Sequence, residues 1–171
     1  MRCPSRYFFL LIFCSLVPAA HSANAAASLG TFANGCFIRT YHAVHLARHP
    51  NQLITKVELA IRDSVGDPKY QSTFALLLQM RGKSKILKTQ GLCTVEGMAR
   101  LHCIVECDGG GVDLNFKEDR AMMYLDRIRM TSCGSDMDDI SNSEEVSGGI
   151  DDREFRLDRI DISGCSNLKP D

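Results

Sequence analysis

The sequence predicts an all-β domain, mainly an antiparallel up-and-down meander of about seven strands that forms a small barrel or sandwich, with one short N-terminal helix. Apolar and polar residues alternate along most of the chain with the period of two that is typical of strands. Clusters of Gly, Asp and Pro, which favour turns, separate these alternating segments. The segments are not joined by helical patterns of about 10–15 residues, which argues against a parallel β-α-β arrangement.

Composition is that of one folded domain. The chain has 171 residues, of which 44% are hydrophobic and 24% are charged. Its formal net charge is -1, whereas a general nucleic-acid-binding protein would carry an excess of Lys and Arg. We therefore expect no nucleic-acid partner.

Residues 1–25 have the organisation of a secretory signal peptide, in which Arg2 and Arg6 precede an apolar run and small residues follow it. The A-x-A pattern that ends at Ala25 marks the cleavage site, and cleavage after Ala23 is the close alternative. The apolar run is too short to span a bilayer, and no second run of spanning length follows. The mature chain is thus expected to be exported, to the periplasm or the extracellular space, with no transmembrane segment.

Two forms of membrane attachment remain as alternatives to cleavage. An uncleaved signal would act as an anchor, and an acylated Cys14 would act as a lipid anchor. Phe13 disfavours the lipid anchor, because a small residue is expected before an acylated cysteine.

Six cysteines remain behind the signal, and an even number in an exported chain predicts up to three disulfides rather than a zinc site. If the last strand of a closed barrel meets the first, Cys36 lies near Cys165. The end of the strand that carries Cys107 is expected to lie near the end of the strand that leads to Cys133, which favours a second pair. Cys93 and Cys103 then remain and would pair across one hairpin. The predicted pairs are Cys36–Cys165, Cys107–Cys133 and Cys93–Cys103.

The elements follow in order along the mature chain. Residues 26–35 are mostly small and form a flexible lead-in, and residues 36–171 form a single disulfide-stapled β domain. The first predicted element is a helix over residues 39–49, which Thr40 caps and Pro50 ends. A helix this short is marginal alone, so we expect it to pack against the rest of the domain.

Strands account for most of the remaining chain, and closure into a barrel would remove their exposed edges. Turn signals separate them, among them Gly66-Asp67-Pro68, Glu96-Gly97 and the stretch Asp108–Gly111. The predicted strands cover residues 53–62, 74–80, 86–95, 99–107 and 112–117, a sixth that ends near residue 130, and a last from about residue 154 to residue 163.

A short internal repeat lies in the sixth and last strands. Leu-Asp-Arg-Ile at residues 125–128 recurs at residues 157–160. In each copy the Leu and the Ile are three residues apart, so the apolar positions shift from one face of a regular strand to the other. A β-bulge at each Asp-Arg pair would produce this shift, whereas chance similarity of two amphipathic strands is the alternative. The Asp and Arg side chains are expected to form surface ion pairs rather than polar groups inside the barrel.

Three histidines are the first candidate site. On a helix, the steps of three and four residues between His42, His45 and His49 place the imidazoles on one face, where zinc, copper or nickel could bind. The pattern lacks the Glu of the H-E-x-x-H metalloprotease motif. Solvated histidines are the favoured interpretation, so no cofactor is expected, although a divalent metal is possible.

An acidic segment at residues 134–152 is the second candidate site. It contains no Lys or Arg, and its spacing does not match an EF-hand loop, which makes calcium binding the weaker interpretation. A solvated loop is favoured, and the segment could also bind a basic protein. The candidate partner-binding residues are Asp136, Asp138, Asp139, Glu144 and Glu145.

Other charged and glycine-rich stretches have simpler interpretations. Arg81, Lys83, Lys85 and Lys88 are expected to form a solvated turn and strand face. The glycines at residues 109–111 lack the context of a phosphate-binding loop and indicate a turn. The chain has no G-x-S-x-G nucleophile motif, so an enzyme is not the favoured class.

Two segments resemble a group of small exported bacterial proteins of unknown function. They are His-Cys-Ile-Val-Glu-Cys-Asp-Gly-Gly-Gly at residues 102–111, which carries the Cys-Asp-Gly-Gly-Gly turn, and Asp-Asp-Arg-Glu-Phe-Arg-Leu at residues 151–157. The resemblance extends over most of the mature chain and implies a bacterial periplasmic location. It brings no activity and no catalytic residue.

The sequence thus indicates an exported, non-enzymatic binding or interaction protein of unknown ligand. One version holds a small apolar ligand inside the barrel with the N-terminal helix as a lid, although the many Leu, Phe and Met residues favour a filled interior. In the other version an unknown protein docks on the acidic segment. The alternative function is a metal-binding protein or metalloenzyme that uses the histidine face.

Overall fold

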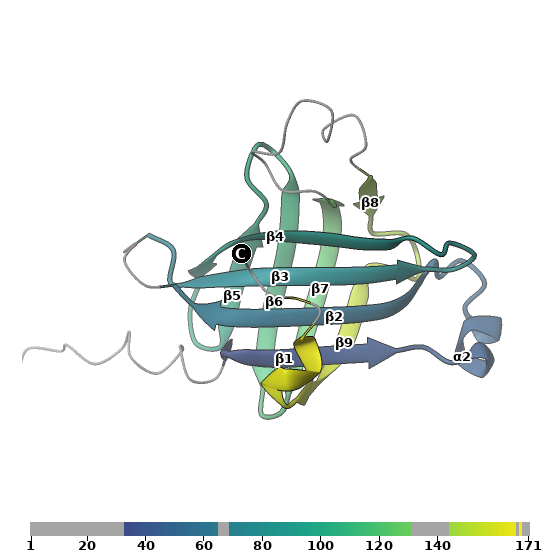
Figure 1. Ribbon diagram of the computed structural model, residues 1–171, viewed down its shortest axis with the longest axis horizontal. Coiled ribbons are helices and arrows are strands. Elements are labelled where there is room, and N and C mark those ends of the chain that lie inside the picture. Colours follow the sequence, from purple (N-terminus) through teal and green to yellow (C-terminus); the bar gives the residue numbers. More distant parts are fainter. Residues whose placement is uncertain (1–32, 65–68, 131–143, 167, 169–171) are drawn as a thin grey trace, which may run out of the picture.

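The computed structural model describes residues 33–64, 69–130, 144–166 and 168. Strands predominate, and the helical elements are short (Figure 1). In chain order the elements are β1 (Gly35–Thr40), α2 (Ala43–Arg48), β2 (Ile54–Asp63), β3 (Ser72–Met80), β4 (Ile86–Val95), β5 (Arg100–Ile104), β6 (Gly110–Lys117), β7 (Arg120–Arg129), β8 (Glu145–Ser147), β9 (Glu154–Ile160) and the 3-10 helix η1 (Ile162–Cys165).

Antiparallel pairing closes the sheet into an eight-stranded barrel. The strand order is β6-β5-β4-β3-β2-β1-β9-β7-β8, and β6 also pairs with β7. The first strand therefore lies between β2 and β9, while the short β8 adds to one end of β7 outside the ring. This confirms the predicted all-β meander, in its barrel form.

Inward-facing side chains fill the barrel. Alternate residues of each strand point inward and form one buried cluster, in which the rings of Phe37 and Phe116 lie 5.4 Å apart. Phe37, Leu59, Leu76, Leu114 and Phe155 have no exposed surface. Close packing of this kind makes the interior a core rather than a ligand cavity.

A second, smaller cluster lies on the outside of the barrel. The 3-10 helix and Leu168 cover the outer face of β1, β2 and β3, where small side chains leave room for them. The disulfide between Cys36 of β1 and Cys165 of η1 holds this cover in place. Its buried members are Cys36, Ala60, Ala75, Leu77, Cys165 and Leu168.

The predicted strand over residues 86–95 coincides with β4, and the other predicted strands overlap observed ones, β5 being shorter than expected. Two short strands, β1 and β8, were missed because each has few buried side chains of its own. The helix prediction was wrong over residues 39–42, because Arg39 and Thr40 pair with β2 as part of β1. The helix begins at Ala43, and Thr40 does not cap it.

The predicted lead-in was wrong at its end, since Gly35 belongs to β1 and Ala33 is buried. The rest of that lead-in, the signal peptide at residues 1–25 and the turn at residues 66–68 lie outside the described residues. In the ranges that the structure does describe, every helix is too short or too polar to cross a membrane.

One of the two predicted bulges is present. Gly111 pairs with Arg127 and Val112 pairs with Leu125, so Asp126 is the extra residue in β7. The second copy of the repeat pairs with β1 in continuous register, so a bulge there was a wrong prediction. Leu157 and Ile160 lie on opposite faces of β9 because Leu157 points into the core, whereas Ile160 points outward and packs against the small outer cluster.

Two of the four Asp and Arg side chains of the repeat, Arg127 and Asp158, form the predicted surface ion pairs, with partners outside the repeat. Arg127 pairs with Glu145 at 3.0 Å, and Asp158 pairs with Arg39 at 3.2 Å. Arg159 instead places its guanidinium 4.8 Å from the centre of the Phe37 ring.

The Cys36–Cys165 and Cys93–Cys103 disulfides are both present, as predicted. Their positions follow from the sheet. Cys93 lies directly opposite Cys103 across the β4–β5 hairpin, and β1 lies beside β9, which leads into η1. Cys107 is also disulfide-bonded, and its predicted partner Cys133 lies outside the described residues.

Candidate functional site

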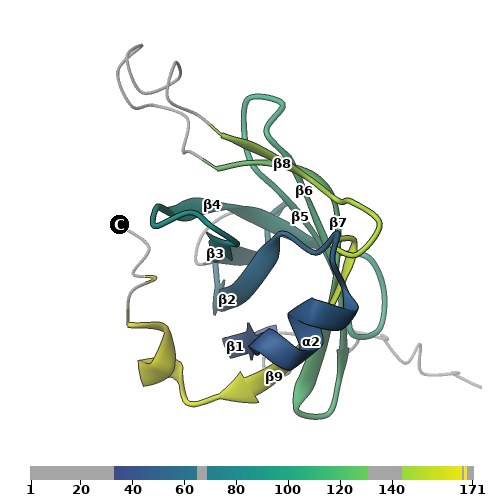
Figure 2. The same cartoon turned by 90° about the vertical axis from the view of Figure 1, so that its right-hand side faces the viewer.

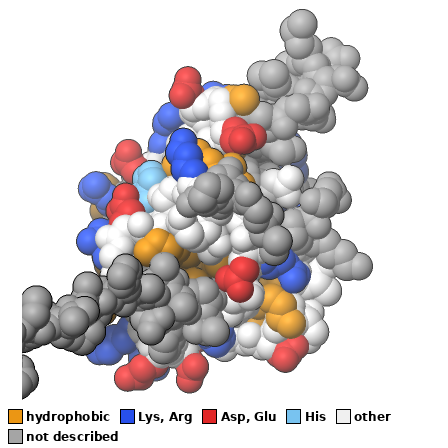
Figure 3. All heavy atoms as spheres, turned by 90° about the vertical axis from the view of Figure 1, so that its left-hand side faces the viewer, with side chains coloured by type: hydrophobic (Ala, Val, Ile, Leu, Met, Phe, Trp, Pro, Cys, Tyr) orange, Lys and Arg blue, Asp and Glu red, His pale blue; other side chains and the backbone are white. Residues whose placement is uncertain are grey.

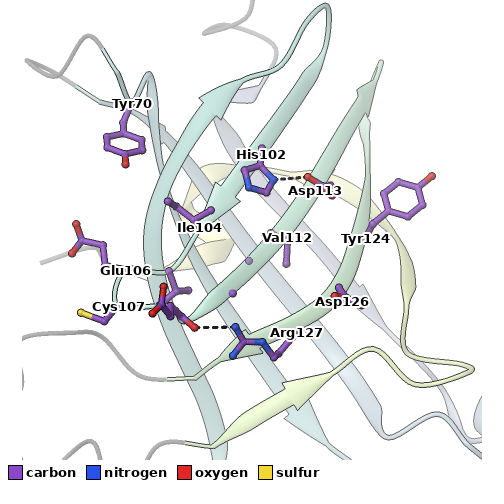
Figure 4. A pocket seen from close by; sticks show the side chains of 14 residues that line it. Tyr70, His102, Ile104, Glu106, Cys107, Val112, Asp113, Tyr124, Asp126 and Arg127 are labelled. Atoms are coloured by element: carbon purple, nitrogen blue, oxygen red, sulfur yellow. Dashed lines mark hydrogen bonds and ion pairs between the residues drawn. The ribbon is translucent and has the colours of Figure 1, made fainter.

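A groove of about 820 Å³ is hollowed into the outer face of β5, β6 and β7 (Figure 4). It extends from the row of side chains across these strands to the turn between β5 and β6, and we call it the β5–β7 groove. It is lined by Tyr70, His102, Ile104, Val105, Glu106, Cys107, Asp108, Gly110, Gly111, Val112, Asp113, Tyr124, Asp126 and Arg127.

Sheet register places three polar side chains in a row across this groove. His102 of β5 lies directly opposite Asp113 of β6, which in turn lies opposite Tyr124 of β7. The His102 Nδ1 atom is 2.7 Å from an Asp113 carboxylate oxygen, and both side chains are exposed. The row therefore presents a preformed polar surface to solvent.

Glycines form part of the groove's surface. A side chain on Gly111 would collide with the carbonyl oxygen of Cys103, and one on Gly110 would collide with that of Arg127. Gly110 also has a φ of 71°, which a residue with a side chain adopts only at a cost. The glycine-rich stretch that the sequence assigned to a turn thus both turns the chain and keeps the groove open.

Carboxylates outnumber cations in the groove. Its one arginine, Arg127, donates hydrogen bonds at 3.0 Å to Glu145 and to the backbone carbonyl of Asp108. Figure 4 shows the acidic side chains on two sides of this space. The groove is therefore a negatively charged surface, with carboxylates at Glu106, Asp108, Asp113 and Asp126.

The side chains that line the groove include acids, a histidine and two tyrosines. The His102–Asp113 pair resembles part of a catalytic triad, but no Ser, Thr or Lys is among the residues that line the groove. Cys107 is disulfide-bonded and offers no thiolate.

A second hollow of about 500 Å³ lies between α2 and the loop that precedes β9. Tyr41, His45 and His49 stack along one wall, with ring centres 4.7 Å and 4.3 Å apart. Burial raises the pKa of the Tyr41 phenol, and the nearby Arg39 guanidinium opposes this only in part. Tyr124 borders this hollow as well as the groove.

The three candidate histidines are not arranged as a metal site. His45 Nε2 lies 2.9 Å from the Gln52 side-chain oxygen, and His49 Nδ1 lies 3.6 Å from Asp151. His42 is an exposed residue at the N-terminal end of α2. Over the described ranges, no three His, Cys, Asp or Glu side chains are grouped so that they could hold a metal ion.

The end of the acidic segment contacts the barrel. Glu144 forms an ion pair with Lys83, and Glu145 pairs with Arg127 at the edge of the groove. Asp136, Asp138 and Asp139 lie outside the described residues.

The predicted basic face is only partly solvated. Arg81 donates hydrogen bonds to the backbone carbonyls of Leu46, His49 and Pro50, so it holds the C-terminal end of α2 instead of pointing into solvent.

Sequence reasoning missed His102, Asp113 and Tyr124 as site residues. Strand alternation placed all three on polar faces, but only the register of β5, β6 and β7 brings them into one row. Comparison with protein-family models, curated proteins and solved structures finds no match to this chain.

Proposed function

We propose that this chain is an exported, non-enzymatic interaction protein that binds a positively charged segment of a partner protein in the β5–β7 groove. The observation that carries the proposal is the charge of the groove. Among the residues that the structure describes, four carboxylates line it, and the one arginine there is already bound by Glu145 and a backbone carbonyl. A Lys- or Arg-bearing segment is the complement of such a surface.

Tyrosines support a cationic partner. Tyr70 and Tyr124 stand on opposite sides of the groove, one before β3 and the other on β7 (Figure 4). The face of a tyrosine ring attracts a guanidinium or ammonium group, as the chain's own Lys69 ammonium illustrates at 4.9 Å from the centre of the Tyr70 ring. The Tyr124 ring would therefore add to the attraction of the carboxylates.

The filled interior of the barrel favours a binding site on the outer surface. Large side chains with no exposed surface fill the space that a small apolar ligand would need. Disulfides and the signal-like residues 1–25 support export, since such bonds persist in oxidising compartments.

The test uses the mature protein with its disulfides intact and a fluorescent Lys- and Arg-rich peptide of about ten residues, with a Glu-rich peptide of equal length for comparison. Binding is followed by fluorescence anisotropy at low and high salt. The basic peptide should bind, more weakly as salt rises, and the acidic peptide should not.

The groove variant is Asp113→Asn with Asp126→Asn. It should weaken binding of the basic peptide at least about tenfold, because it removes two carboxylates that face the peptide. The matched control, Glu96→Gln with Glu118→Gln, removes two carboxylates from turns that do not line the groove. An equal loss in both variants, or no binding by the unaltered protein, would refute the proposal.

A further inference from the structure

Three chain segments meet at one end of the barrel, which we call the helix end. They are residues 41–53 with α2, residues 81–85 between β3 and β4, and residues 148–153 before β9. Figure 2 looks onto this end, with α2 in front. Hydrogen bonds from Arg81 to α2 carbonyls and from the Leu53 N–H to Asp152 join the three segments.

Exposed aliphatic side chains gather at the helix end. Val44 is 68% exposed, Leu53 52%, Ile86 51% and Ile150 88%. They come from α2, from the start of β2, from the start of β4 and from the loop before β9. These side chains contribute little to the core, so their position at one end needs another explanation.

The charge at the helix end is positive. The three segments contain five Arg and Lys and two Asp. Asp152 is buried and binds two backbone N–H groups, and Asp151 pairs with His49 at 3.6 Å near the surface. The exposed cations there are Arg48, Lys85 and Arg153, while Lys83 is paired with Glu144 and the exposed Glu154 follows Arg153.

We propose that the helix end docks on the surface of an anionic lipid bilayer. Aliphatic tips on separate segments suit a fluid lipid interface, because each can enter between headgroups without a matching rigid surface. Exposed Lys and Arg beside them add attraction to acidic headgroups. This site is distinct from the β5–β7 groove, so the two proposals stand or fall separately.

The opposite end of the barrel supplies matched controls. Met98, in the turn after β4, is 93% exposed there. Figure 3 views the molecule from that side and shows acidic and basic side chains interspersed. Arg100 and Lys117 are exposed cations on strands that approach that end.

The test is co-sedimentation of the mature, disulfide-intact protein with two kinds of vesicle, phosphatidylcholine alone and phosphatidylcholine with about 30% phosphatidylglycerol. The protein should sediment with the anionic vesicles at least about fivefold more than with the neutral ones, and high salt should reduce the difference.

Two variants address the helix end. Val44→Ser with Ile150→Ser should lower the bound fraction severalfold, while Met98→Ser leaves it unchanged. Arg48→Glu with Lys85→Glu should abolish the preference for anionic vesicles, while Arg100→Glu with Lys117→Glu preserves it. Unfolding temperatures and peptide binding in the groove should stay the same in all four variants.

Equal losses in helix-end variants and controls would overturn the membrane proposal, as would no binding of the unaltered protein to anionic vesicles. Either result leaves the peptide measurement intact, so a failure of this proposal is distinguishable from a failure of the proposed function.

Discussion

The carboxylate of Asp152 accepts a hydrogen bond from the backbone N–H of Leu53, 2.6 Å away and 99 residues earlier in the chain. Its second oxygen accepts the N–H of Ile54 at 3.1 Å, and only 3% of the residue is exposed. A buried carboxylate with two backbone donors is a strong acceptor. The loop before β9 is thereby attached to the start of β2.

Replacing Asp152 with Ala should therefore lower the free energy of unfolding by about 2–3 kcal/mol, because the buried N–H of Ile54 and the part-buried N–H of Leu53 lose their acceptor. Urea denaturation measures this. Asp151→Ala is the neighbouring control and should cost under about 1 kcal/mol, since its pairing with His49 is a long contact near the surface. Similar losses in both variants would contradict the attachment described above.

Gly91 of β4 is the second test of packing. A Cβ atom there would collide with the carbonyl oxygen of Ile104 and lie 2.7 Å from a Phe74 ring carbon. Gly91→Ala should destabilise the fold by about 3 kcal/mol, because a backbone strand cannot move aside cheaply.

Gly149→Ala is the control for that substitution. Nothing lies within 4 Å of its added Cβ, and its φ is not positive. This variant should be neutral or more stable by about 0.5 kcal/mol, since Ala has fewer unfolded conformations than Gly. Thermal unfolding of the two variants should show opposite or clearly unequal shifts in Tm.

The two disulfides described in full should differ in their effect on stability. All four half-cystines are buried, so their packing losses are comparable. The Cys36–Cys165 bond closes a separation of 129 residues and the Cys93–Cys103 bond one of 10. In the chain-entropy view, removing the first as a double Ala variant costs about 5 kcal/mol and removing the second about 3 kcal/mol. Denaturant titration gives the comparison, and the reverse order would contradict this view.

Asp161 gives a prediction about pH. Hydrogen bonds from the Ser163 side chain and backbone N–H hold the pKa of Asp161 below its ordinary value of 3.8. The folded chain thus favours the carboxylate, and its contribution to stability is present above that ordinary value. It is lost as the pH falls through the lowered folded-state pKa.

An NMR titration of the Asp161 carboxyl carbon measures this pKa directly. The midpoint should lie below 3.8, and Ser163→Ala should raise it by removing the hydroxyl donor. A midpoint at or above the ordinary value would show that the cap at the start of η1 does not form in solution.

Much of the barrel was predictable because apolar and polar residues alternate along large parts of its strands. Leu76 and Leu78 of β3 face the core while Gln79 faces outward, and this period identifies a strand without any tertiary information. β1 gave no such signal. Arg39 and Thr40 stand at the start of the predicted helix, and only pairing with β2 makes them part of a strand.

The groove was not predictable for a related reason. The contact between His102 and Asp113 depends on the register of β5 against β6, which strand periodicity does not determine. Of the three histidines predicted to share one helix face, only His45 and His49 are neighbours, one turn apart and stacked. His42 separates from them because the helix begins after it.

The Cys36–Cys165 bond makes the barrel a covalent ring. It joins the first strand to the helix that follows the last one, so every turn between them lies within a closed circuit of peptide and disulfide bonds. A protease that cut the turn near Met98 would therefore release no fragment, because this bond and Cys93–Cys103 both link the two sides of the cut. Once both bonds are reduced, the two pieces of the same nicked chain would be held together by strand pairing and core packing alone.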